Sequence, residues 1–368
     1  MPKKESLKTS APTEEMLLTN TPPVSSSSIT SKKPKSKLQV IILIAIAMAL
    51  FAIICLVSWV LVAVNSAKDP NNKAQIVFVV EQGSGIDKIA SDLSKKGLIS
   101  DKNLFILYAK LGPSRGKLKP GVYLFSPSMS LSKIADTIGK AEIANKKVVF
   151  QEGLTIAEMG QKWARAGFGT AQDFISGSEP PNSFKQAFLS YRSNPNSLEG
   201  YLYPATYSIV VNTSAADQIS SMLDSFGSVV IPKLPAEYQN SSKLNDLITL
   251  ASIVEKEANT TEDRKLVASV FYNRLKLGMK LESDVTVNYA TGKSETSASD
   301  IGVDSPYNTY KIVGLPLGPI CNPGLDAILA TLNPAQTDYL FFIADKNGVI
   351  RLARTLQEHE ANIKKYLE

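Results

Sequence analysis

Histidine is nearly absent from this chain of 368 residues, which contains only His359, and cysteine occurs only at Cys55 and Cys321. With so few histidine and cysteine side chains, a zinc site built from these residues is not expected. A single histidine also weakens the case for a catalytic triad with a histidine base. Two cysteines far apart in the sequence are too few for a disulfide framework. The sequence also has no P-loop and no HExxH motif, so we expect neither nucleotide nor zinc-peptidase chemistry.

Charged residues are missing altogether from positions 40–64, which read VIILIAIAMALFAIICLVSWVLVAV. As a helix this run would be about 37 Å long, enough to cross a bilayer with some tilt. It is too long for the apolar part of a secretory signal, and a buried core helix seldom lacks any polar face. We therefore expect a transmembrane helix over 38–64 that remains as a membrane anchor.

The charges around this run predict its orientation. Four lysines lie between positions 32 and 37, whereas only Lys68 and Lys73 follow the run, with Asp69 between them. Basic residues concentrate on the cytoplasmic side of membrane spans, so the N-terminus should lie in the cytoplasm and the rest of the chain outside. Residues 1–37 hold seven lysines against three glutamates, so they account for most of the net charge of +6. A basic tail of this kind gives no reason to expect a nucleic-acid partner.

Composition and periodicity divide the chain into five parts. Residues 1–37 are rich in Ser, Thr, Pro and Lys and are expected to form a disordered cytoplasmic tail. The predicted membrane helix follows, and a polar linker covers 65–74. We expect a small β/α domain over 75–145 and a larger mixed α+β catalytic domain over 146–368, so the fold class is α+β.

Hydrophobic patterns and helix caps predict the elements of both domains. In the small domain they are strands at 75–80 and 121–125 and helices at 85–98, 101–111 and 130–140. In the larger domain they are a strand and a helix within 147–168, helices at about 214–227, 241–258 and 261–278, a helix at LDAILATL, a strand at 339–345 and a helix from about 355.

The helix predicted to end near 258 carries two glutamates in the sequence LASIVEKEA. Glu257 shares a helical face with Leu250 and Val254, which lie seven and three residues before it, while Glu255 is turned roughly 200° away. A carboxyl group beside aliphatic side chains is poorly solvated, which raises its pKa and suits it to act as a general acid. The alternative is that the helix frays and Glu257 pairs with a cation such as Arg264. Spacing alone favours neither.

Tyrosine, amide and carboxylate side chains recur in the stretches EGYLYPATY (199–207) and SPYNTY (305–310). Aromatic faces near polar groups suit sugar rings, which present apolar C–H faces and hydroxyl edges. The candidate sugar-binding residues are Glu199, Tyr201, Tyr203, Tyr307, Asn308 and Tyr310, with Asn273 on the next helix and Asp284 in the strand-like SDVTV. Ordinary packing is the alternative for each tyrosine, and Asn273 and Asp284 could each be structural.

The stretches EGYLYP, LASIVEKEA, VASVFYNRL, LESDVTV, SPYNTY and GLPLGPICNPG, in this order, resemble the YceG-like (MltG) endolytic murein transglycosylases. The resemblance covers residues 75–368, with a single membrane span in front. The small domain is similar to the LysM-like module that precedes the catalytic domain in that family. Two positions depart from the motifs, since many relatives have Asp in place of Ala205 and Pro in place of Val285.

The resemblance implies that the protein cleaves the β-1,4 bond between MurNAc and GlcNAc in peptidoglycan strands and leaves 1,6-anhydroMurNAc ends. It implies that Glu257 is the catalytic residue and that Glu255 and Glu199 help to form the site. One carboxyl group then suffices, because the C6 hydroxyl of the sugar replaces the water or second carboxylate of ordinary glycosidases. No metal or cofactor is implied, whereas glycan strands, the cytoplasmic membrane and the penicillin-binding proteins of wall elongation are implied as partners.

Two other functions remain open from the sequence. A hydrolase of the same bond would produce reducing ends, and a non-catalytic wall-binding protein would cleave nothing. A LysM-like module fits all three functions, so it does not separate them. The leading expectation is a single-pass enzyme of the cytoplasmic membrane whose catalytic domain lies outside the cytoplasm.

Overall fold

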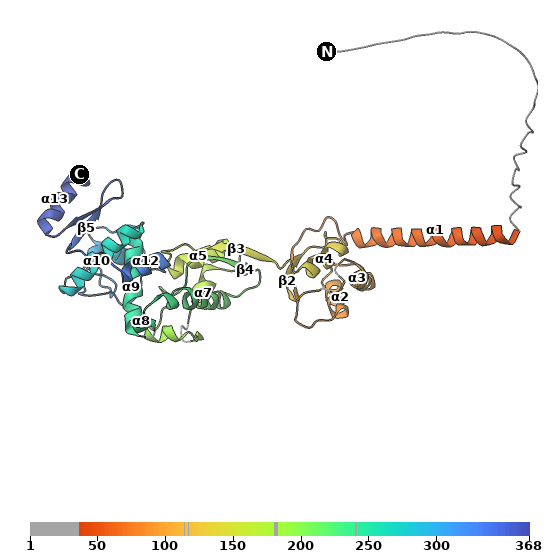
Figure 1. Ribbon diagram of the computed structural model, residues 1–368, viewed down its shortest axis with the longest axis horizontal. Coiled ribbons are helices and arrows are strands. Elements are labelled where there is room, and N and C mark those ends of the chain that lie inside the picture. The colour runs from red at the N-terminus through yellow and green to blue at the C-terminus, as the bar shows by residue number, and fades with distance from the viewer. Residues whose placement is uncertain (1–36, 114, 117, 180–182, 240) are drawn as a thin grey trace, which may run out of the picture. The chain divides into compact units, whose positions relative to one another are not determined.

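The computed structural model describes residues 37–113, 115–116, 118–179, 183–239 and 241–368 (Figure 1). The tail predicted over 1–37 lies outside these residues except for Lys37. The chain divides into two compact units, Met1–Ala63 and Val64–Glu368, which are described in turn.

Helix α1, Lys37–Asn65, contains the whole predicted membrane span. Its most apolar window has a mean hydropathy of 3.4, and nearly all of its side chains are exposed. Among the described residues, no other helix is both long enough and apolar enough to cross a bilayer. So many exposed apolar side chains would be costly in water, and α1 is therefore consistent with a single-pass membrane anchor.

The predicted small domain contains a two-stranded antiparallel sheet of β1, Ile76–Val80, and β2, Gly121–Phe125. One face of this sheet is buried, with Phe78 of β1 opposite Tyr123 of β2. The remaining elements here are the helices α2 (Ile86–Lys95), α3 (Lys102–Leu111) and α4 (Leu131–Lys140). All five predicted elements are confirmed, whereas the LysM-like assignment and the domain boundaries stay predictions.

The first part of the larger domain packs helices against a second two-stranded sheet. Strand β3, Asn145–Val149, pairs antiparallel with β4, Thr206–Val210. The other elements are α5 (Ile156–Arg165), α6 (Ala171–Gly177), η2 (Ala187–Tyr191), α7 (Ala215–Val229), η3 (Ile231–Lys233) and α8 (Ala236–Gln239). Their core is rich in aromatic side chains, including Phe150, Trp163, Phe174 and Phe226, all of them almost fully buried.

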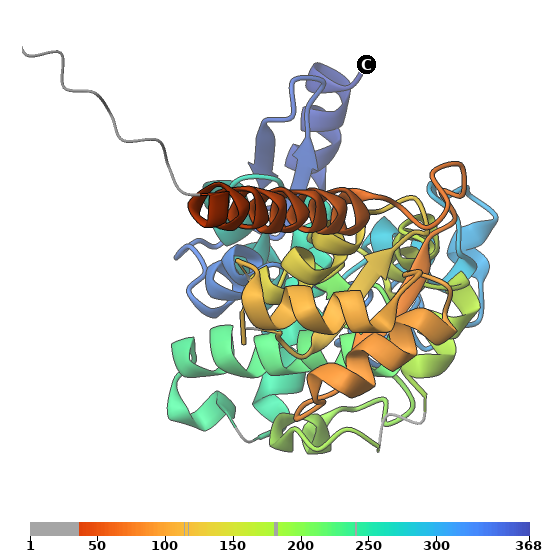
Figure 2. The same ribbon diagram turned by 90° about the vertical axis from the view of Figure 1, so that its right-hand side faces the viewer.

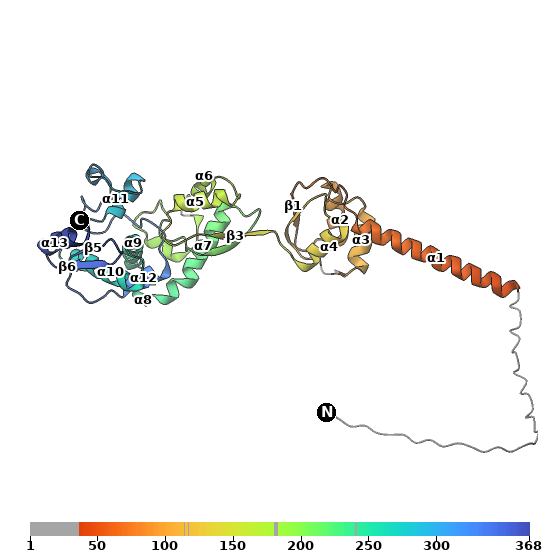
Figure 3. The same ribbon diagram turned by 90° about the horizontal axis from the view of Figure 1, so that it is seen from above.

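The second part is built around helix α9, Ser242–Glu257, which packs against α10 (Thr261–Lys276) and α12 (Leu325–Leu332) (Figures 1 and 3). Between α10 and α12 the chain forms α11 (Asp284–Thr291) and η4 (Asp300–Gly302). The chain ends in an antiparallel hairpin of β5 (Phe341–Ala344) and β6 (Ile350–Ala353), followed by α13 (Leu356–Tyr366). In Figure 2 this hairpin and helix, in dark blue, lead to the labelled C-terminus. The described chain is therefore a mixed α+β structure.

Helix α9 is buried on two sides, not one. Its residues Leu247, Ile248 and Ala251 belong to the aromatic core of the first part, whereas Leu250 and Val254 belong to a second core shared with α10. Each side of the helix therefore ends in a glutamate, because Glu255 lies four residues after Ala251 and Glu257 lies three after Val254. The prediction that Glu257 continues an apolar face is confirmed, but the other face is buried as well.

Candidate active site

A cleft of about 420 Å³ opens beside the C-terminal end of α9. Part of its lining comes from residues 281–284 and Tyr310, which we call the motif wall. Another part comes from the end of the chain, which we call the C-terminal wall; it consists of Phe341, Phe342, Ile343, Ala344, Leu356, His359 and Leu367. Glu257, Phe271 and Arg274 complete the lining, so one glutamate of LASIVEKEA faces an open space.

Glu257 is the last residue of α9, and its Oε1 accepts a hydrogen bond of 2.6 Å from Ser283 Oγ. Burial raises the pKa of this carboxyl group, the hydrogen bond from Ser283 lowers it, and the charge of Asp284 raises it further. The C-terminal end of a helix carries partial negative charge, which also disfavours a carboxylate. Glu257 can therefore hold its proton to a higher pH than an exposed glutamate, as a general acid requires.

The helix does not fray before Glu257. Ala258 is the first extended residue (φ −142°, ψ 142°), and its N–H still donates to the carbonyl of Val254 at 3.1 Å. Arg264 pairs with Glu255, at 2.6 Å, and not with Glu257. The alternative raised by the sequence, a frayed end with Glu257 paired to Arg264, is therefore wrong.

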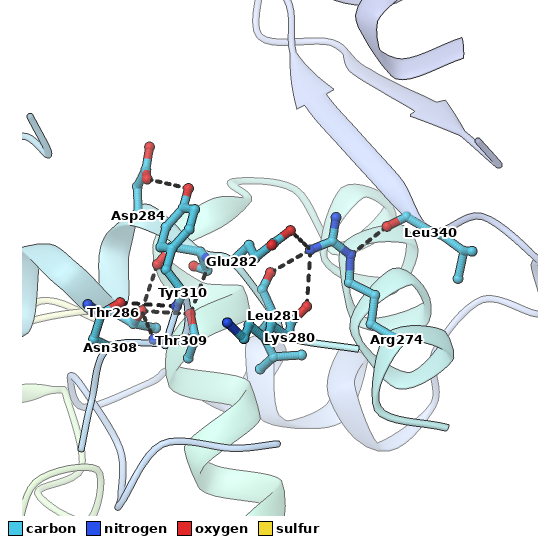
Figure 4. Close-up of polar contacts among 11 residues, drawn as sticks. Arg274, Lys280, Leu281, Glu282, Asp284, Thr286, Asn308, Thr309, Tyr310 and Leu340 are labelled. Carbon is cyan, nitrogen blue, oxygen red and sulfur yellow. Dashed lines mark hydrogen bonds and ion pairs between the residues drawn. The ribbon is translucent and has the colours of Figure 1, made fainter. Parts of the chain in front are cut away.

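Asp284 and Tyr310 lie together in the motif wall (Figure 4). Tyr310 Oη donates to Asp284 Oδ1 at 2.8 Å, and burial together with this hydrogen bond raises the pKa of the phenol. Asp284 is exposed at the first residue of α11. Among the acids that line the cleft, Glu257 therefore lies at the C-terminal end of a helix and Asp284 at the N-terminal end of another.

Two buried threonines hold Ser283 in place. The N–H of Ser283 donates to Thr309 Oγ1 at 3.1 Å, and Thr286 Oγ1 donates to the carbonyl of Ser283 at 2.6 Å. The two threonine hydroxyls also bond to each other at 2.8 Å, and both side chains are fully buried. The motifs SDVTV and SPYNTY therefore meet at one point, where they fix the donor that contacts Glu257.

The prediction that SDVTV is strand-like is wrong, because α11 begins at Asp284. Valine and threonine favour strands by local propensity, but that preference is weak and yields to tertiary contacts. Here Thr286 turns back to the Ser283 carbonyl, and Val287 is fully buried. Gly292 ends the helix in the left-handed region at φ 69°.

Sequence reasoning missed the C-terminal wall. Phe341 and His359 stack with ring centroids 5.2 Å apart, and both line the cleft with Phe342. Burial lowers the pKa of His359, and the nearby Arg274 charge lowers it further. These residues follow Glu257 by more than eighty positions, so no spacing argument connects them to it. His359 is the single histidine of the chain, so its rarity is the one sequence signal that points to this wall.

Glu255 is held in a closed network on the other side of α9. Its Oε1 accepts from Arg264 Nη2 at 2.6 Å, and its Oε2 accepts from the N–H of Gly324 at 2.8 Å. Arg264 also pairs with Asp326 at 2.6 Å. Burial raises the pKa of Glu255, while the Gly324 and Arg264 contacts oppose that rise. With its side chain 6% exposed and outside the cleft lining, Glu255 joins α9 to α10 and to the loop before α12.

Glu199 lies in the same closed region. Its carboxyl group accepts from the N–H of Ile156 at 3.1 Å and from Asn322 Nδ2 at 2.7 Å. Burial outweighs these hydrogen bonds and raises the pKa of Glu199 to about 8. Asn322 Oδ1 in turn accepts from the N–H groups of Gly200 and Leu202, so EGYLYP and CNPG are tied to each other.

The predicted sugar-binding tyrosines separate in the structure. Tyr201 is buried in the aromatic core, 3.4 Å from Asn245 Oδ1, and Tyr203 packs against the same core. Tyr307 Oη accepts from Asn194 Nδ2 at 3.2 Å and is not part of the cleft lining. Only Tyr310 lies with Glu257.

The two predicted amides connect pieces of backbone. Asn308 is fully buried and donates to two carbonyls of the 301–303 turn, at 2.9 and 2.8 Å. Asn273 donates to the carbonyls of Thr337 and Tyr339, at 2.9 and 3.0 Å. Neither lines the cleft.

Of the predicted site residues, the cleft therefore brings together Glu257, Asp284 and Tyr310. Within the part of the chain that the structure describes, no group of three His, Cys, Asp or Glu side chains could hold a metal ion.

Comparison with known proteins agrees with the motifs. A model of the YceG-like family matches residues 78–365. The chain is 33% identical over 329 residues to the endolytic murein transglycosylase of Streptococcus pneumoniae strain D39, covering 81% of this chain and 60% of that protein. It is 33% identical over 313 residues to the endolytic murein transglycosylase of Bacillus subtilis strain 168, covering 81% of this chain and 87% of that protein. The chain thus spans less than two thirds of the pneumococcal relative.

A solved structure is also similar to this chain. The crystal structure of a protein described as yceG-like from Listeria monocytogenes matches with a TM-score of 0.53 and 35% sequence identity. The match covers 78% of this chain and 99% of that one.

Proposed function

The chain belongs to the YceG-like family, and from this membership we propose that it is a membrane-anchored endolytic lytic transglycosylase of peptidoglycan. The bond cleaved is the β-1,4 bond from MurNAc to GlcNAc, and the product is a 1,6-anhydroMurNAc end. Glu257 is the catalytic residue, as general acid and then as general base. The observation that supports this best is a carboxyl group of raised pKa in an open cleft, with one hydrogen bond from Ser283.

In the first step the protonated carboxyl group of Glu257 donates its proton to the glycosidic oxygen. The bond between that oxygen and C1 of MurNAc breaks, and GlcNAc leaves with a free C4 hydroxyl. Positive charge develops at C1 and the ring oxygen, and the exposed carboxylate of Asp284 in the same cleft would stabilise it.

In the second step the C6 hydroxyl of MurNAc attacks C1 and the anhydro ring closes. The carboxylate of Glu257 takes the hydroxyl proton, which returns the enzyme to its starting state. No water is consumed. Ser283 supports this step because its hydrogen bond stabilises the carboxylate form of Glu257.

The cleft offers complementary surfaces for a glycan strand. Phe341 and Phe342 present apolar area for the C–H faces of the sugar rings, and Asp284 and Tyr310 present hydrogen-bonding groups for their hydroxyl edges. The substrate contacts proposed here therefore lie in the motif wall and the C-terminal wall. Glu199, Glu255, Tyr201, Tyr203, Tyr307, Asn273 and Asn308 would shape the site from outside the cleft.

The rest of the chain would place this activity at the membrane surface. With lysines before α1, the N-terminus lies in the cytoplasm and the cleft outside it, next to newly made glycan. The part at 75–145 would act as a LysM-like wall-binding domain before a catalytic domain at 146–368. Penicillin-binding proteins of wall elongation are the proposed protein partners.

Hydrolysis of the same bond is a second candidate, and the position of Asp284 favours it. A second carboxylate in the cleft could activate water, as in ordinary inverting glycosidases. The two reactions differ in their products, since hydrolysis adds one water and leaves a reducing end.

The test is mass spectrometry of muropeptides after the full chain, purified with α1 in detergent, is incubated with peptidoglycan. We expect anhydro ends from the wild type and none from Glu257→Gln. Glu262→Gln is the matched control, because Glu262 is exposed in the first turn of α10 and outside the cleft lining. Its products should equal those of the wild type.

The other outcomes each decide against the proposal. Reducing ends that disappear in Asp284→Asn would establish hydrolysis. Cleavage by Glu257→Gln at the wild-type rate would remove Glu257 from the mechanism. Retention of the wild-type protein on peptidoglycan without any cleavage would indicate a wall-binding protein.

A further inference from the structure

Arg274 of α10 is a buried cation that bonds to the motif wall and to Leu340, the residue just before the C-terminal wall (Figure 4). Its Nη1 donates to the carbonyl of Leu281 at 2.8 Å and to that of Lys280 at 3.3 Å. The same nitrogen lies 3.4 Å from Glu282 Oε2, and Nε donates to the carbonyl of Leu340 at 2.6 Å. The side chain is only 9% exposed, so these contacts replace the water that a guanidinium would otherwise bind.

The partners of Arg274 are the backbone segments that begin each wall. Residues 280–282 lead directly to Ser283, the donor to Glu257. Leu340 leads directly into β5 and its cleft residues. The guanidinium also lies 5.0 Å from the centre of the Phe341 ring, so it contacts the C-terminal wall through a side chain as well. The single guanidinium group of Arg274 therefore joins residues 280–282 to Leu340, which lie about sixty residues apart in the sequence.

The segment held by Arg274 is strained. Glu282 has φ 49°, in the left-handed region, where only one other described non-glycine residue is found. A glutamate in that conformation persists only where its surroundings hold it. The surroundings here are Arg274 on one side and the N–H of Glu282 bonded to the carbonyl of Thr309, at 3.2 Å, on the other.

We infer that Arg274 is a positioning residue for the reaction: it holds Ser283 against Glu257 and holds the C-terminal wall beside the same carboxyl group. Arg274 does not need to touch the substrate for this role. The inference rests on the proposed function for its kinetic test, whereas its structural test is independent of any activity.

Charge and position must be separated in the test, because several charged or titratable groups line the cleft together with Glu257. They are Glu282, Asp284 and Tyr310 in the motif wall, Arg274 of α10 and His359 of α13. A variant without the Arg274 charge would change the electrostatics of the cleft as well as the contacts of Arg274. Arg274→Lys avoids this problem, because lysine keeps the charge but cannot reproduce the fork that reaches several carbonyls at once.

The kinetic test compares Arg274→Lys with Ser283→Ala in the full chain. Loss of the Ser283 hydrogen bond should raise the pKa of Glu257, so the fall of kcat on the alkaline side should move to higher pH in Ser283→Ala. Arg274→Lys should move it in the same direction and lower kcat on the order of 10- to 100-fold, as expected for misplaced catalytic groups. It should also raise KM, because the C-terminal wall is released, and raise it more than Ser283→Ala does, since that variant removes only one hydroxyl of the motif wall.

The double variant Arg274→Lys/Ser283→Ala decides whether Arg274 acts through Ser283. If it does, the alkaline shift in the double variant equals that of Ser283→Ala alone. Additive shifts, or an unchanged pH profile in Arg274→Lys, would overturn the inference. Arg165→Lys, at an exposed position of α5, is the matched control and should behave as the wild type.

Hydrogen exchange gives the readout that needs no activity. In Arg274→Lys, amides in peptides covering 280–284 and 338–342 should exchange several-fold faster than in the wild type, while Ser283→Ala should leave 338–342 unchanged. If Arg274→Lys does not fold, Glu282→Gln replaces it, since it neutralises one ionic contact of Arg274 at a side chain that is 45% exposed. It should speed up amide exchange in 280–284 alone.

Unchanged exchange in both segments refutes the inference even if the wild type proves to be a transglycosylase. A wild type that cleaves nothing refutes the proposed function and leaves this test valid.

Discussion

The two sides of α9 end in the same residue type but in different surroundings. On one side Glu255, Glu199, Arg264 and Asn322 form a closed network in which each group has several protein partners. On the other side Glu257 has a single hydrogen bond, from Ser283, and faces a cleft. Burial raises the pKa of the carboxyl group in all three glutamates.

These glutamates differ in how many hydrogen bonds their carboxyl groups could still form with another molecule. A buried carboxyl group surrounded by protein donors can join elements of the fold but has no room for a substrate. A carboxyl group with one donor beside open space can exchange its proton with a bound molecule. A raised pKa alone therefore does not distinguish the three glutamates, whereas the cleft beside Glu257 does.

The largest effects should come from replacing each glutamate of EKE in turn. Glu257→Gln should lower the cleavage rate about a thousandfold, because general acid–base catalysis is lost, and should leave stability unchanged or slightly raised. Glu255→Gln should show the reverse: near-normal cleavage at low temperature, and a loss of about 2 kcal/mol of unfolding free energy from the weakened contact with Arg264. Cleavage rates and thermal unfolding of the full chain measure both. An inactive, stable Glu255→Gln would reverse the assignment of the two glutamates.

Asn322→Ala should give the next largest effect, this time on stability. The amide bonds four groups in the closed network, among them Glu199 and the N–H of Gly200. Unpaired buried polar groups cost about 1–3 kcal/mol each, so we expect a loss of about 4 kcal/mol of unfolding free energy.

Denaturant titration of the full chain measures this loss. Asn196→Ala, at an exposed position, is the control and should stay within about 0.5 kcal/mol of the wild type. A loss of that small size in Asn322→Ala as well would mean that the closed network contributes little to the fold.

Local sequence predicted the elements of this fold well. The helices of the small domain, α9, α10, α12 and α13 follow apolar periodicity and caps, and the structure has them within a few residues of the predicted bounds. SDVTV failed because two buried threonine contacts from SPYNTY outweigh a strand preference. Strands β4 and β6 were missed, since each is a short strand stabilised by pairing with a partner.

The candidate site was only partly predictable. Helix periodicity predicted which glutamate faces the cleft. Whether the other motif residues line the cleft depends on contacts between segments that are distant in the sequence. Glu199 and Asn322 are 123 positions apart and bond directly. A motif shows that its residues matter together, without separating those that build the site from those that line it. Phe341 and His359 belong to no quoted motif, so only the folded chain places them beside Glu257.

The next effect in size should be a pH dependence of the unfolding free energy that comes from Glu199 of the closed network. Burial raises the pKa of Glu199 to about 8, so the native state binds this proton more tightly than the unfolded chain does. The stabilisation of the native state by proton binding at Glu199 is therefore fully present below the unfolded pKa of about 4.5. It is lost as the pH rises through about 8. We expect the unfolding free energy to fall by on the order of 3 kcal/mol between pH 5 and pH 8, since each pH unit in this window costs about 1.4 kcal/mol.

Denaturant titrations at several pH values test this expectation. Glu199→Gln should flatten the pH dependence, because glutamine does not titrate, whereas Glu262→Gln should leave it unchanged. A slope that persists in Glu199→Gln would assign the proton to another group, with Glu257 as the first to examine.

The smallest effect should come from Val285→Pro, which tests the motif wall beside the open cleft. Val285 is the second residue of α11, and the first turn of a helix tolerates proline because its N–H groups have no partner within the helix. Lost packing and a stiffer unfolded chain oppose each other, so we expect a stability change within about 1 kcal/mol and cleavage close to the wild type. Val287→Pro, fully buried two residues later, should cost about 3 kcal/mol or more, since proline there clashes with the preceding turn. Thermal unfolding of the two variants compares them. Equal losses would mean that the segment is extended in solution, and Ser283 would then lose the support that sets its hydroxyl against Glu257.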